Sequence, residues 1–147
     1  NANIKWAERG EKERVWICNP GHPISKGLGE YFEIEMTEMY GEPFQVPDPD
    51  ETVFISWFEG GEVFRSGLCY KRGNGKIFYF RPGHEAYPVY HNEYVQKAIS
   101  NAIYWLNKGE NAGTWDDSFN PKDTMERKEP IEPIEVKGYQ VDHTYQK

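Results

Sequence analysis

Cysteine is scarce in this sequence, which contains only Cys18 and Cys69 among its 147 residues. The two do not form a C-x-x-C pair, and two thiols in a chain of this length support neither a disulfide framework nor a zinc knuckle. Cys69 falls within a predicted strand, where a buried small hydrophobe is a better interpretation than a nucleophile. This cysteine usage favours a reducing compartment, and we expect a cytoplasmic protein.

Long apolar runs and an excess of basic residues are also absent. No stretch approaches the roughly 20 apolar residues that a membrane span needs, and residues 1–15 contain no hydrophobic secretory segment. Acidic residues number 24 against 17 basic ones, and the resulting charge of −7 would repel a phosphate backbone. We therefore expect neither a membrane nor a nucleic acid as a partner.

Aromatic side chains, by contrast, make up 16% of the chain. Most of them are expected in a core, but a flat ring with a polar tip also suits a sugar-binding cleft. The length is typical of a single domain. The composition thus allows a carbohydrate ligand as well as an aromatic core.

Apolar segments bounded by turn residues predict about six strands. Five of them can be located, at residues 14–18, 30–36, 52–58, 63–70 and 76–80. Glycine-containing turns join the last three into an antiparallel β meander. Asn92 predicts the start of a helix and Gly109 its end, with apolar positions three or four residues apart at Val95, Ala98, Ile99, Ala102, Ile103 and Leu106. A single helix cannot cover both faces of a doubly wound sheet, so we expect this chain to be part of a larger fold.

Ionisable side chains gather after the last predicted strand. His84 and Glu85 follow residues 76–80 through Arg81, and His91 comes shortly afterwards. Open α/β sheets bind ligands at the carboxyl ends of their strands, and a histidine there can act as an acid or base near neutral pH. The alternative is a turn histidine hydrogen-bonded to backbone. We favour function, because four ionisable groups on loops within eleven residues seldom serve packing.

His22 lies in a similar setting, between a glycine and a proline, and a turn or helix-start role is an equal alternative. If His22, His84 and His91 converge, they would bind zinc or manganese together with Glu38 or Glu42, since imidazole and carboxylate suit these metals. Glu38 and Glu42 would be paired carboxylates in a helix and solvated surface charges in an extended segment. The sequence leaves both alternatives open.

Four segments together resemble the ThuA-like trehalose-utilisation family over roughly residues 5–106. They are Gly21-His22-Pro23-Ile24, residues 38–42, residues 54–67 and residues 76–85. The resemblance implies an α/β fold, the flavodoxin-like three-layer sandwich of the class I glutamine amidotransferase-like superfamily, of which residues 1–108 would form the C-terminal portion. Residues 109–147 would form an extended arm. A missing N-terminal segment or a second chain would complete the sheet, and we also expect a homo-oligomer.

The resemblance also implies a role in sugar catabolism. Amidotransferase chemistry is not expected, because the related enzymes use a His-Pro-Glu triplet where this chain has Gly83-His84-Glu85, and no nucleophilic cysteine is evident. The resemblance supports acid/base chemistry instead, such as isomerisation of a keto-disaccharide through an enediol. His84 would move protons while Arg81 or Glu85 orients it. The residues that would bind hydroxyls, stack on a sugar or hold a metal are His22, Glu38, Tyr40, Glu42, Trp57 and His91.

Two alternatives to an enzyme remain. The chain is a noncatalytic sugar-binding or regulatory module if rings such as Trp57 and Tyr40 stack on pyranose faces without turnover. It is an assembly subunit if exposed sheet edges hold it to another polypeptide.

Overall fold

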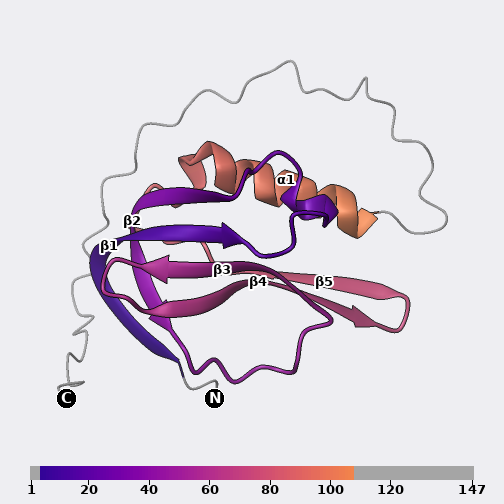
Figure 1. The fold of residues 1–147 in the computed structure, drawn as a ribbon, viewed down its shortest axis with the longest axis horizontal. Coiled ribbons are helices and arrows are strands. Elements are labelled where there is room, and N and C mark those ends of the chain that lie inside the picture. The colour runs from indigo at the N-terminus through magenta and orange to yellow at the C-terminus, as the bar shows by residue number, and fades with distance from the viewer. Residues whose placement is uncertain (1–3, 108–147) are drawn as a thin grey trace. The chain divides into compact units, whose positions relative to one another are not determined.

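The computed structural model describes residues 4–107 of the chain (Figure 1). Five strands, two short 3₁₀ turns and one α-helix follow one another along the sequence. They are β1 (Lys5–Ile17), η1 (Pro23–Ser25), β2 (Tyr31–Gly41), β3 (Glu51–Phe58), β4 (Val63–Arg72), β5 (Gly75–Phe80), η2 (Val89–His91) and α1 (Glu93–Asn107). The predicted arm at 109–147, and Gly109 with it, lie outside the described residues.

The five strands form one curled sheet in the order β2-β1-β3-β4-β5, and every neighbouring pair is antiparallel. The predicted β3-β4-β5 meander is confirmed. Gly61, with φ of 91°, and Gly73, with φ of 57°, lie in its two turns, where a backbone in the left-handed region favours glycine. The curl brings the end of β2 back to β4, where the Glu42 amide donates to the Val63 carbonyl at 3.0 Å.

Strand β1 is much longer than the sequence predicts. It spans 13 residues and begins at Lys5, whereas the continuous apolar segment begins only at Val15 and residues 8–14 are polar or glycine. The β1–β2 pairing shifts register between Ala7 and Glu11 and again between Glu11 and Glu13, and Gly10 has a φ of 67°. Such bulges interrupt the period-two pattern by which a strand is recognised in a sequence.

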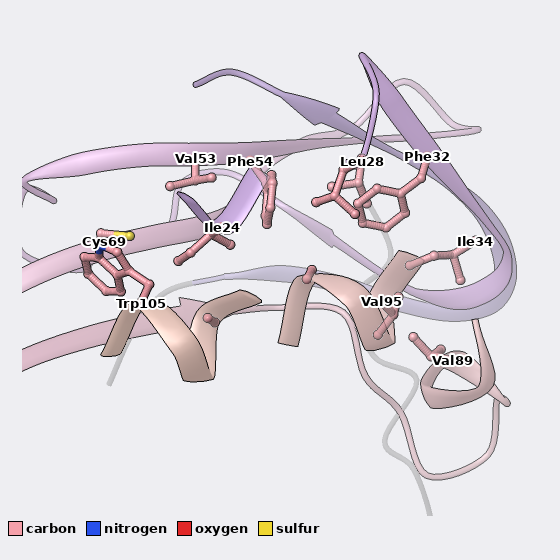
Figure 2. Close-up of a cluster of buried hydrophobic side chains, with 13 residues drawn as sticks. Ile24, Leu28, Phe32, Ile34, Val53, Phe54, Cys69, Val89, Val95 and Trp105 are labelled. Atoms are coloured by element: carbon pink, nitrogen blue, oxygen red, sulfur yellow. The ribbon is translucent and has the colours of Figure 1, made fainter. Parts of the chain in front are cut away.

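Helix α1 covers one face of the sheet and encloses the main core (Figures 1 and 2). Figure 2 shows Val95 and Trp105 of the helix facing the sheet residues Phe54 and Cys69. The helix begins where predicted, because the Asn92 side chain accepts hydrogen bonds from the Tyr94 and Val95 amides at 2.9 and 3.2 Å. A second, smaller core cluster contains Met39, Phe58 and Phe64.

The buried face of α1 differs from the predicted one at its end. Ile103 and Leu106 are exposed, and Trp105 is buried in their place. Trp105 lies three residues after Ala102 and seven after Ala98, on the stripe that faces the sheet, whereas Ile103 lies about 100° further round the helix. The apolar periodicity located the helix but placed its inner face slightly wrongly.

One sheet and one helix make two layers in the part of the chain that the structure describes. The α/β character is confirmed in this coarse sense, with a curled antiparallel sheet. No parallel strand pair occurs among residues 4–107, so the flavodoxin-like three-layer sandwich stays a prediction.

Candidate active site

Arg81 lies immediately after β5 and forms the centre of a buried polar network. Its Nη1 donates to Glu13 Oε2 on β1 at 2.5 Å, and its Nη2 donates to Thr37 Oγ1 on β2 at 2.9 Å. The Ser56 hydroxyl of β3 donates to the other oxygen of Glu13. All four side chains are buried. We call Arg81, Glu13, Thr37 and Ser56 the Arg81 network.

The charges in this network are desolvated but paired. Complete burial raises the pKa of the Glu13 carboxyl, while the Arg81 guanidinium and the Ser56 hydroxyl oppose that rise. The rings of Tyr40 and Phe58 lie 5.0 and 5.2 Å from Arg81 Cζ and add cation–π contacts. A buried ion pair of this kind fixes geometry more than it adds stability.

The Arg81 network extends to Glu38, which connects it with a second group of side chains. Arg81 Nη2 also donates to the Glu38 main-chain carbonyl at 2.5 Å. The Glu38 carboxylate turns towards His84, where its Oε2 lies 3.7 Å from Nε2. Arg81 therefore holds the backbone from which the Glu38 carboxylate projects.

His84 is enclosed by carboxylates and aromatic rings. Its side chain is 6% exposed, and Nε2 lies 4.0 Å from Glu8 Oε1 and 3.8 Å from Glu85 Oε2. The Tyr87 ring lies 4.8 Å from the imidazole. Glu38 is 14% exposed, whereas Glu85 projects into solvent. We call His84, Glu38, Glu8, Tyr40 and Tyr87 the His84 cluster.

The proton of neutral His84 is on Nε2. Nδ1 accepts a hydrogen bond from the Ala86 amide at 3.0 Å, so its lone pair is in use and the neutral ring carries hydrogen on the other nitrogen. Nε2 is more than 3.5 Å from every carboxylate around it, beyond hydrogen-bond range. His84 therefore presents an N–H donor beside the Glu38 carboxylate, and the two groups are not hydrogen-bonded to each other.

Two tyrosines flank the carboxylates of the His84 cluster. Burial and a hydrogen bond with Glu38 raise the pKa of Tyr40 to about 12. Burial, together with the charges of Glu8 and Glu38, also raises the pKa of Tyr87. Both hydroxyls therefore stay protonated and can donate hydrogen bonds near neutral pH.

A glycine shapes the loop that carries His84. The Tyr90 hydroxyl packs so closely on Gly83 that a Cβ there would overlap it. This contact holds the loop between β5 and η2 against the next segment. A side chain at position 83 would have to displace the Tyr90 ring, which is 56% exposed.

His22 occupies a different place, in the core under α1. Its Nδ1 accepts from the Ile24 amide at 3.2 Å and so caps η1, and its ring lies 5.1 Å from the Trp105 ring. Nε2 is 3.9 Å from Cys69 Sγ and 4.0 Å from Glu51 Oε1. Burial lowers the pKa of His22.

Glu42 follows the end of β2 and pairs with Arg65 of β4. Its carboxylate accepts from Arg65 Nε at 2.8 Å and from the Phe44 amide at 2.5 Å. Burial would raise the pKa of Glu42, but these hydrogen bonds outweigh it and lower the pKa. Because Glu38 and Glu42 flank an extended segment with separate partners, the helical pairing of the two carboxylates is wrong.

The family of the chain follows from one comparison. A family model described as trehalose utilisation, ThuA, matches residues 2–106. The chain belongs to the trehalose-utilisation family. The predicted resemblance is thereby confirmed, and membership of the trehalose-utilisation family gives the chain a carbohydrate-related role. A search of curated proteins found no match.

The structure unites only some of the side chains that the sequence singled out in this member of the trehalose-utilisation family. Arg81, Glu38, Tyr40 and His84 lie together, with Glu85 at the solvent side. Arg81 is buried and reaches Glu38 rather than His84. His91 is exposed in η2, and Trp57 projects from β3 away from the buried Ser56.

A metal site is not evident in the described region. Among residues 4–107 no three His, Cys, Asp or Glu side chains are grouped so that they could hold a metal ion. His22 and His84 have entirely different neighbours. A zinc or manganese site formed by His22, His84 and His91 stays a prediction. Within the same residues, no helix combines the length and apolar character needed to cross a membrane.

Sequence reasoning missed Glu13, Ser56, Thr37 and Glu8. A usable signal existed for Ser56, the one polar residue inside the apolar run at 53–58. Glu13 carried a weaker one, since it alternates with Val15 and Ile17 and so shares their inward face. A polar residue at a core position indicates a buried partner.

Proposed function

We propose that this chain isomerises a keto-disaccharide or related keto-sugar through an enediol. One observation carries the proposal: the enclosed Nε2–H of His84 lies 3.7 Å from the Glu38 carboxylate. Enediol formation needs a base beside the carbon next to a carbonyl and a donor for the carbonyl oxygen. A carboxylate base combined with a neutral imidazole donor is an established solution for this chemistry.

The roles follow from the hydrogen bond between the Ala86 amide and His84 Nδ1, which fixes the tautomer of the neutral ring. Neutral His84 has no free lone pair in the ring, because Nδ1 already accepts from Ala86, so its part is to donate from Nε2 to the carbonyl oxygen. The Glu38 carboxylate removes the proton from the neighbouring carbon. The same proton returns from Glu38 to the former carbonyl carbon. His84 gives its Nε2 proton to the former carbonyl oxygen, which becomes a hydroxyl, and regains a proton from the hydroxyl group that becomes the new carbonyl. The sum is a shift of the carbonyl group along the sugar.

Arg81 supports this reaction as a positioning residue. It binds the Glu38 carbonyl at 2.5 Å and is itself fixed by Glu13 and Thr37. The Tyr40 hydroxyl bonds to Glu38. These contacts hold the base in one orientation, which is how a rigid site lowers the cost of reaching the transition state.

Hydrogen exchange into an oxidised trehalose in deuterated water tests the proposal. Glu38→Gln should reduce exchange at the carbon beside the carbonyl by on the order of 10²-fold or more, because an amide cannot accept the proton. His84→Gln should also slow exchange. The control is Glu35→Gln, which alters a β2 carboxylate that is 80% exposed and should leave the rate unchanged.

Several outcomes would contradict an isomerase. Exchange at the wild-type rate in Glu38→Gln would exclude the base, and no exchange in the wild type would exclude the reaction. Calorimetry that detects sugar binding without exchange would favour the noncatalytic sugar-binding module.

A further inference from the structure

A shallow groove of about 220 Å³ lies on the face of the sheet that Trp57 occupies. Its lining residues come from β1, β2, β3 and the turn after β3: Lys12, Arg14, Glu33, Trp57, Phe58 and Glu59. Trp57 is 50% exposed, whereas its neighbours Ser56 and Phe58 are buried. Alternation along a strand therefore places the Trp57 ring on the opposite face from the Arg81 network.

The polar side of this groove is ordered before any ligand arrives. Arg14 donates to Glu33 Oε1 from Nε at 3.0 Å and from Nη2 at 2.6 Å, and Lys12 Nζ lies 2.8 Å from Glu33 Oε2. The Arg14 guanidinium also lies 4.5 Å from the Tyr31 ring. Arg14 is the strand partner of both Glu33 and Trp57, so the three form a row across the sheet. Such preorganisation reduces the entropy lost on binding.

The charges of the groove indicate the class of ligand. Lys12 and Arg14 balance Glu33 and Glu59, so the groove favours neither an anion nor a cation. Among residues 4–107, Arg14 uses only Nε and Nη2 on Glu33, which leaves Nη1 as a donor. Donors and acceptors side by side match hydroxyl groups, which both donate and accept, and an exposed indole offers a flat apolar face to a sugar ring.

We propose that the groove at Trp57, Arg14 and Glu33 is a second saccharide-binding site, which holds a pyranose ring without chemical change. The ring stacks on Trp57, and its hydroxyls bond to Arg14, Glu33 and Glu59. The site does not depend on the proposed isomerase reaction, because it shares no side chain with the His84 cluster. It would hold the remote end of a longer saccharide or a separate sugar molecule.

Calorimetry of the full chain with trehalose tests the proposal, with sorbitol as an acyclic polyol that has no ring to stack. Trehalose should bind and sorbitol should not. Trp57→Ala should weaken trehalose binding at this site by roughly two- to tenfold, the loss expected for one aromatic contact. Trp6→Ala removes an indole of similar exposure, 47%, from outside the groove and should have no effect.

Further measurements distinguish the groove at Trp57 from the His84 cluster and from a protein-contact surface. His84→Gln should keep trehalose affinity at the groove even if it abolishes exchange, so failure of the isomerase and failure of this site are distinguishable. Unchanged binding in Trp57→Ala, an equal loss in Trp6→Ala, or no binding by the wild type would overturn the proposal. A change of mass in Trp57→Ala by light scattering, without a change in trehalose affinity, would assign the groove to a protein contact and also overturn it.

Discussion

At the residue scale, His22 was expected at a sugar site and lies in the core instead. Its contacts with Ile24, Cys69 and Trp105 are those of the helix-start alternative that the sequence left open. The flanking glycine and proline were read correctly as a turn. What the sequence could not indicate was the covering helix, which begins some seventy positions later in the chain.

The burial of His22 gives a testable pH dependence. Because its pKa is lowered in the folded protein, the unfolded chain binds a proton more readily, and protonation favours unfolding. Neutral His22 should contribute fully to stability above about pH 6.5, the pKa of an unburied histidine. This contribution should be lost as the pH falls from there through the lowered pKa of His22 in the folded protein. Urea midpoints measured between about pH 8 and about pH 5 should therefore fall less steeply in His22→Gln than in the wild type.

The matched control for this experiment is His91→Gln, since His91 is exposed on η2. It should follow the wild-type curve. Parallel curves for the wild type and His22→Gln would show that the burial of His22 has no bearing on acid stability.

At the element scale, the start of α1 connects the helix with the edge of the sheet. Asn92 caps the helix with Oδ1, and its Nδ2 donates to the Glu33 carbonyl of β2 at 2.8 Å. Asn92→Ala removes both contacts and should lower the free energy of unfolding by about 1–2 kcal/mol. Asn92→Asp keeps the cap and loses the bond to the Glu33 carbonyl, so its free energy of unfolding in urea titrations should lie between that of the wild type and that of Asn92→Ala. Equal stability of the Ala and Asp variants would assign no value to the cap.

Element prediction succeeded where apolar periodicity was strong and failed where it was weak. The meander followed from apolar segments joined by glycine-containing turns, and α1 from apolar positions three or four residues apart. The first half of β1 is polar because much of it remains open to solvent, and bulges shift its register. The first half of β1 is a strand because it pairs with β2, and the hydrophobic pattern of its own residues does not reveal that pairing.

At the scale of the whole molecule, the Arg81 network fastens strands that are distant in sequence. Glu13 and Arg81 are 68 positions apart, yet their ion pair joins β1 to the end of β5, and Thr37 and Ser56 add β2 and β3. Arg81 itself could be singled out from the sequence as an ionisable residue after a strand. Alternation with Val15 places Glu13 on the inward face of β1, but no local feature shows that Arg81 is the residue it meets after the sheet curls.

Breaking this pair should affect the entire domain. Glu13→Gln leaves the Arg81 charge buried without its carboxylate, and we expect a loss of about 3–5 kcal/mol in unfolding free energy. Glu35→Gln, which alters an exposed partner of Lys12, should cost less than about 1 kcal/mol. Chemical denaturation followed by circular dichroism measures both. A loss for Glu13→Gln no larger than that for Glu35→Gln would contradict a fastening role.

The contrast between buried Arg81 and exposed Trp57 has a practical consequence for variant libraries. A screen of this chain for expression level alone should deplete substitutions at Glu13 and Arg81. Loss of either buried side chain destabilises the fold, and cells degrade destabilised protein. The same screen should leave Trp57 free to vary. Substitutions at Trp57 would be depleted only when saccharide binding is selected. Two successive screens would therefore separate the positions needed for folding from the positions needed for saccharide binding.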